Sequence, residues 1–237
     1  MNNKLGIFIT VEGGEGVGKT TNMLFIENWL DKKNIKYTST REPGGTPLAE
    51  NIRELLLTPS DELINENTEL LLMFAARAQH LSQVILPSLK QGKWVLCDRF
   101  TDASFAYQGG GRGMSDKKIS LLENFVQGTL RPDLTILLDI PVKDGLKRAL
   151  SRSKPDRFEQ EKIEFFDRVR KTYIDRSKKF PKQYKVIDAS KKLDQVELKI
   201  EAILEEFLKK KLKKYKRNLK VKKRIIIHRR ILNMTTN

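Results

Sequence analysis

Residues 13–20 read Gly13-Gly14-Glu15-Gly16-Val17-Gly18-Lys19-Thr20 and match the pattern G-x-x-x-x-G-K-[ST]. A short apolar run precedes this loop, and the amphipathic stretch TNMLFIENWL follows it. Glycines let backbone N–H groups converge on phosphate oxygens, and the start of a helix adds a positive dipole. Lys19 is expected to reach the β- and γ-phosphates and Thr20 to bind Mg²⁺. The loop therefore predicts a site for ATP phosphates between a strand and a helix.

The rest of the chain alternates short apolar runs with longer stretches of helical periodicity. Strands are predicted at 5–11, 35–40, 94–98, 134–140 and 184–188. Helices are predicted at 19–33, 47–57, 68–90, 116–128, 142–152, 160–179 and 193–212. The strands are nearly continuous in apolar character, which is typical of a parallel sheet covered on both faces. This order predicts one α/β domain with a five-stranded parallel sheet flanked by helices.

The net charge of +16 is concentrated at the C-terminal end. Residues 209–237 carry all but +3 of it, because they contain Lys and Arg but no Asp or Glu. We therefore divide the chain into a domain over 1–210 and a basic extension over 211–237. The extension could form a basic amphipathic helix that contacts an anionic membrane surface or nucleic acid. A solvated extension without a role is favoured, because no aromatic interleaving accompanies the charge.

Cysteine and apolar content exclude several classes of protein. Cys97 is the only cysteine, so no internal disulfide is expected, and no Cys/His cluster has the spacing of a zinc site. No segment has the length of a membrane span, and the N-terminus lacks the features of a signal peptide. A reducing, cytoplasmic location is expected. Trp29, Trp94 and Phe125 are expected in the core, and His80 is expected to be a surface or packing residue.

Asp98 and Arg99 end the third predicted strand. The carboxyl ends of parallel strands are where ligands bind in open α/β sheets. Asp98 is expected to hold Mg²⁺ through water and Arg99 to contact phosphate. The alternative is a structural ion pair at the strand end, and the preceding phosphate loop favours the functional interpretation. No Asn-Lys-x-Asp segment that would specify guanine is found.

Further motifs occur in a consistent order along the chain. They are Arg41-Glu42-Pro43-Gly44-Gly45-Thr46, Met73-Phe74-Ala75-Ala76-Arg77, Asp98-Arg99-Phe100, the stretch from Ala106 to Gly113, and Asp156-Arg157-Phe158-Glu159-Gln160-Glu161. Together they resemble the thymidylate kinase family, of the bacterial type, over about residues 5–208. The resemblance implies a nucleoside monophosphate kinase fold with a lid and Mg²⁺-dependent phosphoryl transfer from ATP to dTMP, for dTTP synthesis. It also implies a homodimer.

The resemblance assigns the sugar and phosphate of the acceptor to particular residues. Glu15 matches the carboxylate that grips the 3′-hydroxyl of the sugar. Arg53 matches a residue on the acceptor phosphate, with Pro43 shaping that pocket. Tyr107 matches the tyrosine packed under the deoxyribose, which disfavours a 2′-hydroxyl.

At the base, Arg77 matches the arginine that hydrogen-bonds the thymine edge, and Gln108 is expected beside it. The family usually has an aromatic residue four positions before this arginine, and Met73 stands there instead. Phe74 shares a helix face with Arg77, and methionine can also pack against a pyrimidine. Either residue could cover the base, and both could equally be plain helix core.

Cations are dense between the fourth and fifth predicted strands, where a lid would close over ATP. One type in the family places an arginine in the phosphate loop after the glutamate, and here that position is Gly16. The lid is therefore expected to supply arginines, and Arg152 and Arg157 match lid positions. Arg148 could either contribute or lie on a solvated helix face. Lys19, Asp98, Arg99, Arg152 and Arg157 form the expected catalytic set.

Two other functions remain open from the sequence. The nearest is a kinase for another nucleotide or deoxynucleoside, because Met73 departs from the family pattern. The other is an RNA- or DNA-binding protein in which the basic extension dominates.

Overall fold

The computed structural model describes residues 6–151 and 155–234, with side chains up to residue 213. The chain divides into two compact units, Met1–Glu197 and Leu198–Asn237. The first contains the sheet and the phosphate loop. The predicted boundary at residue 210 differs from this division and stays a prediction.

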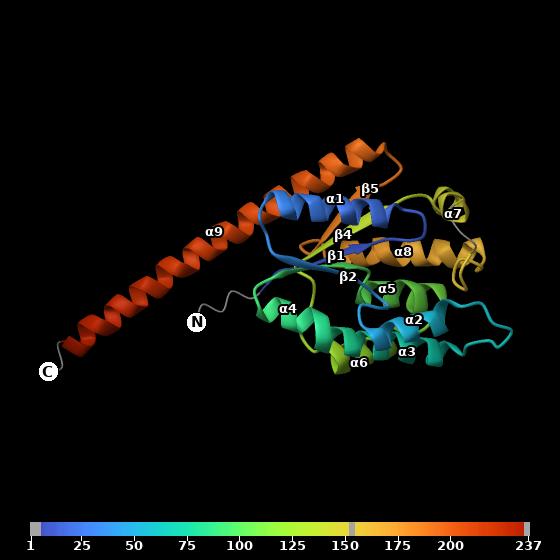
Figure 1. Cartoon of the computed structure of the whole chain (residues 1–237), viewed down its shortest axis with the longest axis horizontal. Helices are drawn as coiled ribbons and strands as arrows, with labels where there is room; N and C mark the ends of the chain where they lie inside the picture. Colours follow the sequence, from blue (N-terminus) through green and yellow to red (C-terminus); the bar gives the residue numbers. More distant parts are fainter. Residues whose placement is uncertain (1–5, 152–154, 235–237) are drawn as a thin grey trace. The chain divides into compact units, whose positions relative to one another are not determined.

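Within the described residues, five strands form one parallel sheet (Figure 1). They are β1 (Phe8–Glu12), β2 (Tyr37–Arg41), β3 (Trp94–Asp98), β4 (Leu134–Asp139) and β5 (Tyr184–Asp188), in the order β2-β3-β1-β4-β5. β1 is central, and Val11 pairs in register with Asp98 of β3. All strands therefore end at one edge of the sheet, which confirms the predicted fold class.

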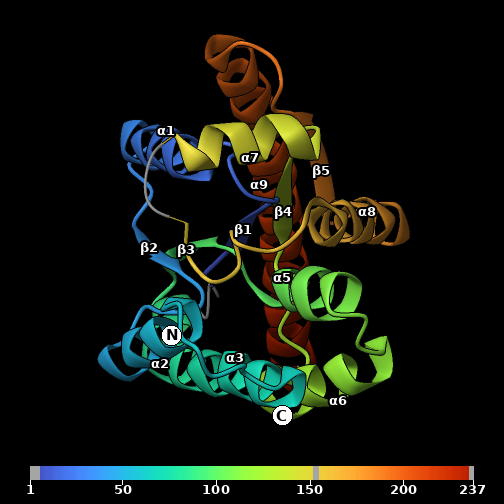
Figure 2. The same cartoon turned by 90° about the vertical axis from the view of Figure 1, so that its right-hand side faces the viewer.

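Helices cover both faces of the sheet. On one face lies α1 (Lys19–Lys32), which contacts β1 and β3. On the other face, α4 (Leu86–Lys90) contacts β3, and α8 (Ile163–Lys179) contacts β4 and β5 (Figures 1 and 2). The remaining helical segments of this unit are α2 (Pro47–Leu57), α3 (Glu66–His80), η1 (Leu81–Ile85), α5 (Thr101–Ser104), η2 (Phe105–Gly111), α6 (Asp116–Gln127) and α7 (Val142–Leu150).

Local sequence explains where the helices around the site begin and change geometry. The Thr46 hydroxyl accepts a hydrogen bond from Ala49 N at 3.2 Å and caps α2, which has Pro47 in its first turn. Asn65 caps α3 in the same way. The predicted helix 68–90 contains the π-helical segment η1 just before Pro87. Because proline lacks a backbone N–H, the regular hydrogen-bond ladder cannot continue through it.

The core lies on both faces of the sheet. Phe8, Ile9 and Val11 of β1 are each at most 1% exposed, and Trp29 and Trp94 are buried as expected. Phe125 was wrongly expected there and is 85% exposed. α6 buries Ile119, Glu123 and Gln127, which recur every four residues, and Phe125 lies off that face.

The second unit contains most of α9 (Leu193–Met234). The helix predicted over 193–212 thus continues through the basic segment. None of the helices that could be examined is long and apolar enough to cross a membrane.

Candidate active site

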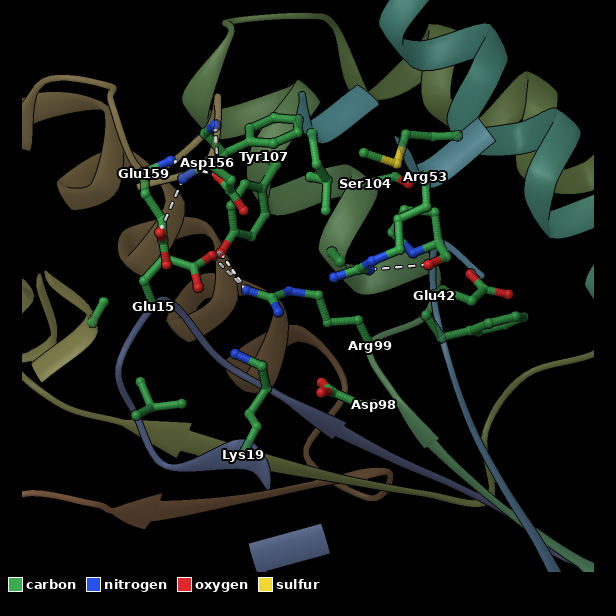
Figure 3. A pocket seen from close by; sticks show the side chains of 18 of the residues that line it. Glu15, Lys19, Glu42, Arg53, Asp98, Arg99, Ser104, Tyr107, Asp156 and Glu159 are labelled. Atoms are coloured by element: carbon green, nitrogen blue, oxygen red, sulfur yellow. Dashed lines mark hydrogen bonds and ion pairs between the residues drawn. The ribbon is translucent and has the colours of Figure 1, made fainter. Parts of the chain in front are cut away.

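A cavity of about 290 Å³ lies at the carboxyl edge of the sheet. Its walls come from the phosphate loop, the β2–α2 loop, α3, the segment after β3, η2 and residues 156–159. Figure 3 shows carboxylates and cations from these elements facing one another across it. Sequence segments far apart along the chain therefore meet at the edge predicted to bind ligands.

The phosphate loop has the expected form. Gly18 has a φ of 88°, a value that favours glycine, directly before α1. Lys19 Nζ donates to the carbonyl oxygens of Gly13 at 3.2 Å and Gly14 at 2.8 Å. Burial, followed by the charge of Arg99, lowers the pKa of Lys19. The ammonium is thus held over its own loop, and residues 15–20 line the cavity.

Gly16 has a specific steric reason to be glycine. A Cβ atom at this position would lie 1.9 Å from the carbonyl oxygen of Gly145 on α7. The φ of Gly16 is also positive, at 66°. The loop consequently has no room for an arginine at this position.

Glu15, Arg99 and Tyr107 form a hydrogen-bonded triad in the cavity (Figure 3). Arg99 Nη2 donates at 2.7 Å to Glu15 Oε1 and at 2.7 Å to the Tyr107 hydroxyl, which donates to Glu15 Oε1 at 2.6 Å. Burial alone would raise the pKa of Glu15. The charges of Arg99 and Lys19 and the Tyr107 hydrogen bond outweigh it and lower that pKa to about 2. Glu15 is therefore an ionised acceptor at neutral pH.

Asp98 ends β3 beside the phosphate loop. Its Oδ1 atom is buried without a hydrogen-bond partner, and the residue lines the cavity with Thr20. An orphaned carboxylate oxygen and a hydroxyl lining the same cavity fit a partly hydrated Mg²⁺. No group of three or more His, Cys, Asp or Glu side chains in the described ranges could hold a metal ion by itself.

Arg53 marks a second cationic point of the cavity. Its Nη1 atom donates at 3.0 Å to the carbonyl oxygen of Pro43, which follows a cis peptide bond. Burial, then the charges of Arg41 and Arg99, lowers the pKa of Arg53. Mutually repelling guanidinium groups in one cavity favour an anion between them.

Arg77 of α3 also lines the cavity and is only 3% exposed. Its Nε donates to Glu42 Oε2 at 2.7 Å, and its Nη2 donates to Phe100 O and Ser104 Oγ. Nη1 is buried without a partner. Buried polar atoms normally have hydrogen-bond partners, so this free donor marks a position for a ligand acceptor.

Glu42 is itself held by a second residue. Glu42 Oε1 lies 3.0 Å from His80 Nδ1, and His80 Nε2 lies 2.7 Å from Thr40 Oγ1. His80 is completely buried, so it is a packing residue, and it also fixes Glu42.

The structure separates Met73 from Phe74. Met73 lines the cavity, as does Gln108. Phe74 is 2% exposed and packs with Leu70, Phe105, Met114 and Ile119. The Arg77 guanidinium carbon lies over the Phe74 ring, 4.6 Å from the ring centre. The structure therefore does not bring Phe74 to the cavity, because its side of α3 faces the core.

Of the two predicted lid arginines, only Arg157 lies within the described residues, and it is not brought to the phosphate loop. Arg152 lies outside the described residues. Arg157 does not line the cavity, because its side chain is bound to Glu69 and to the carbonyl oxygen of Leu56. Arg148 donates to the carbonyl oxygen of Ala189.

Sequence reasoning missed several residues of this site. Ser104, Phe158 and Glu159 line the cavity, and Glu42 orients Arg77. Glu42, Phe158 and Glu159 stand inside recognised motifs, so their place in the sequence could have indicated a role in the site. Ser104 lies outside these motifs, and no local pattern indicates it.

A parallel sheet, a phosphate loop at its carboxyl edge, and an adjoining cavity lined by Arg53, Arg77 and Arg99 define a P-loop kinase of nucleoside monophosphates.

Comparisons with known proteins give the family. A sequence model described as thymidylate kinase matches residues 11–200. The thymidylate kinase of Pseudomonas savastanoi pv. phaseolicola is 56% identical over 203 residues, which cover 86% of this chain and 97% of the relative. That of Pseudomonas putida (strain F1) is 57% identical, covering 84% of this chain and 95% of the relative. The crystal structure of thymidylate kinase from Ehrlichia chaffeensis superposes with a TM-score of 0.68 at 34% identity, covering 84% of this chain and 98% of that one.

The chain belongs to the thymidylate kinase family. Enzymes of this family phosphorylate dTMP to dTDP with ATP in the synthesis of dTTP.

Proposed function

We propose that the cavity binds dTMP with its phosphate at Arg53 and Arg99 and its base at Arg77, while residues 13–20 bind the phosphates of ATP. An oxygen of the dTMP phosphate attacks the γ-phosphorus of ATP. The new P–O bond forms as the bond to the β-phosphate oxygen breaks, which yields dTDP and ADP. The observation that carries this proposal is the buried, unpartnered Nη1 of Arg77, on a side chain that lines the same cavity as Arg53 and the phosphate loop.

The residues at the phosphate loop neutralise the negative charge of the phosphate groups. Lys19 exchanges the carbonyl oxygens of Gly13 and Gly14 for phosphate oxygens, and Arg99 neutralises charge on the groups that react. Asp98 and Thr20 would hold Mg²⁺, which supplies charge neutralisation to the ATP phosphates. The orphaned Oδ1 of Asp98 supports this assignment.

The nucleoside is read by hydrogen bonding and packing. Glu15 accepts from the 3′-hydroxyl, and Tyr107, held by Glu15 and Arg99, packs under the deoxyribose. Arg77 Nη1 donates to the O4 atom of thymine, and Gln108 lies beside it. Met73 is the residue that packs against the base, because it is the one of the pair that lines the cavity.

Two variants test these assignments, one at the proposed phosphate contact and one at the proposed base contact. Arg53→Met and Arg77→Met are assayed by ADP release with ATP, Mg²⁺ and dTMP. Loss of a charged hydrogen bond to substrate is expected to lower kcat/KM for dTMP by about tenfold or more in each variant, with the KM for ATP little changed. Full activity of either variant would remove that residue from the acceptor site.

We also propose that the enzyme is a cytoplasmic homodimer. Leu71 of α3 and Leu121 and Phe125 of α6 are 57%, 71% and 85% exposed, and α3 contacts α6 (Figure 2). Leu121 and Phe125 lie four residues apart and share a face of α6, and exposed apolar side chains of this size favour burial against a partner. Sedimentation analysis tests the pairing: Phe125→Asp should produce monomers, whereas an unchanged dimer would place the interface elsewhere.

A further inference from the structure

Glu69 of α3 joins three segments of the protein through one buried carboxylate. It is 1% exposed and accepts from Gln108 Nε2 at 2.9 Å, from Arg112 Nη2 at 3.2 Å and from Arg157 Nη2 at 2.7 Å. Arg112 also forms an ion pair with Glu161. A carboxylate bound by two guanidinium groups is a strong junction, because both hydrogen bonds are charge-assisted.

Arg157 is anchored at more points than Glu69 alone. Its Nε donates to Leu56 O at 2.7 Å, and its backbone N donates to Leu57 O at 3.0 Å. Its guanidinium lies 4.4 Å from the centre of the Phe158 ring. Withdrawal of the side chain toward ATP would leave the buried carboxylate of Glu69 short of one partner and the Leu56 carbonyl without this donor, which is unfavourable.

The anchored segment forms a wall of the cavity. Asp156, Phe158 and Glu159 all line it, and Figure 3 shows Asp156 and Glu159 beside Tyr107. The Phe158 ring meets the Tyr107 ring edge to face at 5.8 Å. The wall therefore stands against the residue proposed to carry the deoxyribose.

Glu69 also fixes the orientation of Gln108. An ionised carboxylate only accepts hydrogen bonds, so the Gln108 amide must turn its NH₂ group toward Glu69. The group that Gln108 can then offer a ligand in the cavity is its carbonyl oxygen. Thymine presents an N–H donor next to O4, and this edge matches an acceptor from Gln108 beside a donor from Arg77.

We propose that Glu69 and Arg157 form a buried clasp that holds residues 156–161 as a fixed wall of the acceptor pocket and orients Gln108 toward the base. Arg157 is then a positioning residue for the acceptor and does not contact the transferring phosphoryl group. This inference rests on the proposed function in that the acceptor is dTMP.

Steady-state kinetics and dTMP binding by calorimetry distinguish the two roles of Arg157. Arg157→Ala is expected to raise both KM and Kd for dTMP about tenfold or more, with the KM for ATP within about twofold of wild type. Glu69→Gln should give the same pattern. The double variant should be no worse than the worse single variant, because both remove one interaction. A large loss of kcat with unchanged dTMP binding would overturn the proposal.

Lys171→Ala on α8 is the control, because its ion pair with Asp175 is exposed and Lys171 does not line the cavity. It should leave all constants unchanged. If Arg157→Ala does not fold, Arg157→Lys replaces it. One ammonium cannot reproduce the planar contacts to both Glu69 and Leu56, so the rise in dTMP Kd is still expected. Wild-type dTMP affinity in Arg157→Lys would contradict the clasp.

Hydrogen exchange separates a failure of this inference from a failure of the proposed function. In the ligand-free protein, Glu69→Gln should increase exchange of residues 156–161 at least tenfold over wild type, whether or not dTMP is the substrate. Unchanged protection of these amides would refute the clasp, even in an active dTMP kinase.

Discussion

The Nε atom of Arg77 donates a 2.7 Å hydrogen bond to Oε2 of Glu42, and both side chains are only 3% exposed. The ion pair turns the guanidinium so that its Nη1 atom remains free beside the cavity. In the proposed function, specificity for the acceptor base therefore depends on Glu42, a residue of the β2–α2 loop that need not touch the base itself.

Glu42→Gln should damage both stability and acceptor binding. The neutral amide leaves the charge of Arg77 uncompensated, and breaking a buried pair costs about 3–5 kcal/mol. The free energy of unfolding in urea should fall by about 3 kcal/mol, and the KM for dTMP should rise about tenfold or more. Asp175→Asn is the control, because its ion pair with Lys171 is exposed and should change stability by less than about 0.5 kcal/mol. Equal effects of the two substitutions would argue against a positioning role for Glu42.

Met73→Ala should chiefly affect dTMP binding, whereas Phe74→Ala should chiefly affect the stability of the fold. Phe74 is 2% exposed in the core, so its truncation should cost about 3–5 kcal/mol of unfolding free energy. Met73 lines the cavity, so its truncation should chiefly raise the KM for dTMP. Chemical denaturation and steady-state kinetics on both variants check this. A stable Phe74→Ala enzyme with impaired dTMP binding would reverse the assignment.

Glu12 should make stability fall as pH rises. Burial, then the charge of Asp102, raises the pKa of Glu12 from its ordinary value of 4.5 to about 8. Between those pH values the folded state holds a proton that the unfolded state has lost. The free energy of unfolding should therefore decrease by about 1.4 kcal/mol per pH unit in this window from this group alone.

The Glu12 carboxyl accepts hydrogen bonds from Phe100 N at 2.7 Å and from the Tyr173 hydroxyl at 2.9 Å. Glu12→Gln keeps the shape of this side chain but removes the group that binds the proton. Urea unfolding at pH 5, 6, 7 and 8 should give a flatter pH profile than wild type. Parallel profiles for the two proteins would show that Glu12 is ionised in the folded state.

The sheet could be predicted because its strands are either apolar runs, as in β1, β3 and β4, or rich in β-branched and aromatic residues, as in β2. The segment 101–111 is missing from the predicted helices, and its three consecutive glycines, Gly109 to Gly111, have low helix propensity. Its backbone is helical through α5 and η2, and Arg168 donates to the carbonyl oxygens of Gly110 and Gly111 from α8. Such tertiary hydrogen bonds override local propensity.

The predicted site residues likewise divide into those that line the cavity and those that do not. Lys19, Asp98, Arg77 and Tyr107 stand in motifs, and the cavity gathers them. Arg157 also stands in a motif, but its partner Glu69 lies 88 positions away and draws it from the phosphate loop. Pairing between segments so far apart leaves no local pattern in one sequence.

The assignment of Arg77 to the O4 edge of thymine determines which acceptor the proposed site takes. The most direct measurement is ADP release with ATP and Mg²⁺ against dTMP, dUMP and dCMP, using wild type and Arg77→Met. Wild type should prefer dTMP, accept dUMP more weakly, and reject dCMP, which presents an amino donor where thymine has O4. Arg77→Met should lose most of the preference for dTMP over dCMP. Comparable wild-type turnover of dCMP, or unchanged discrimination in Arg77→Met, would contradict the account.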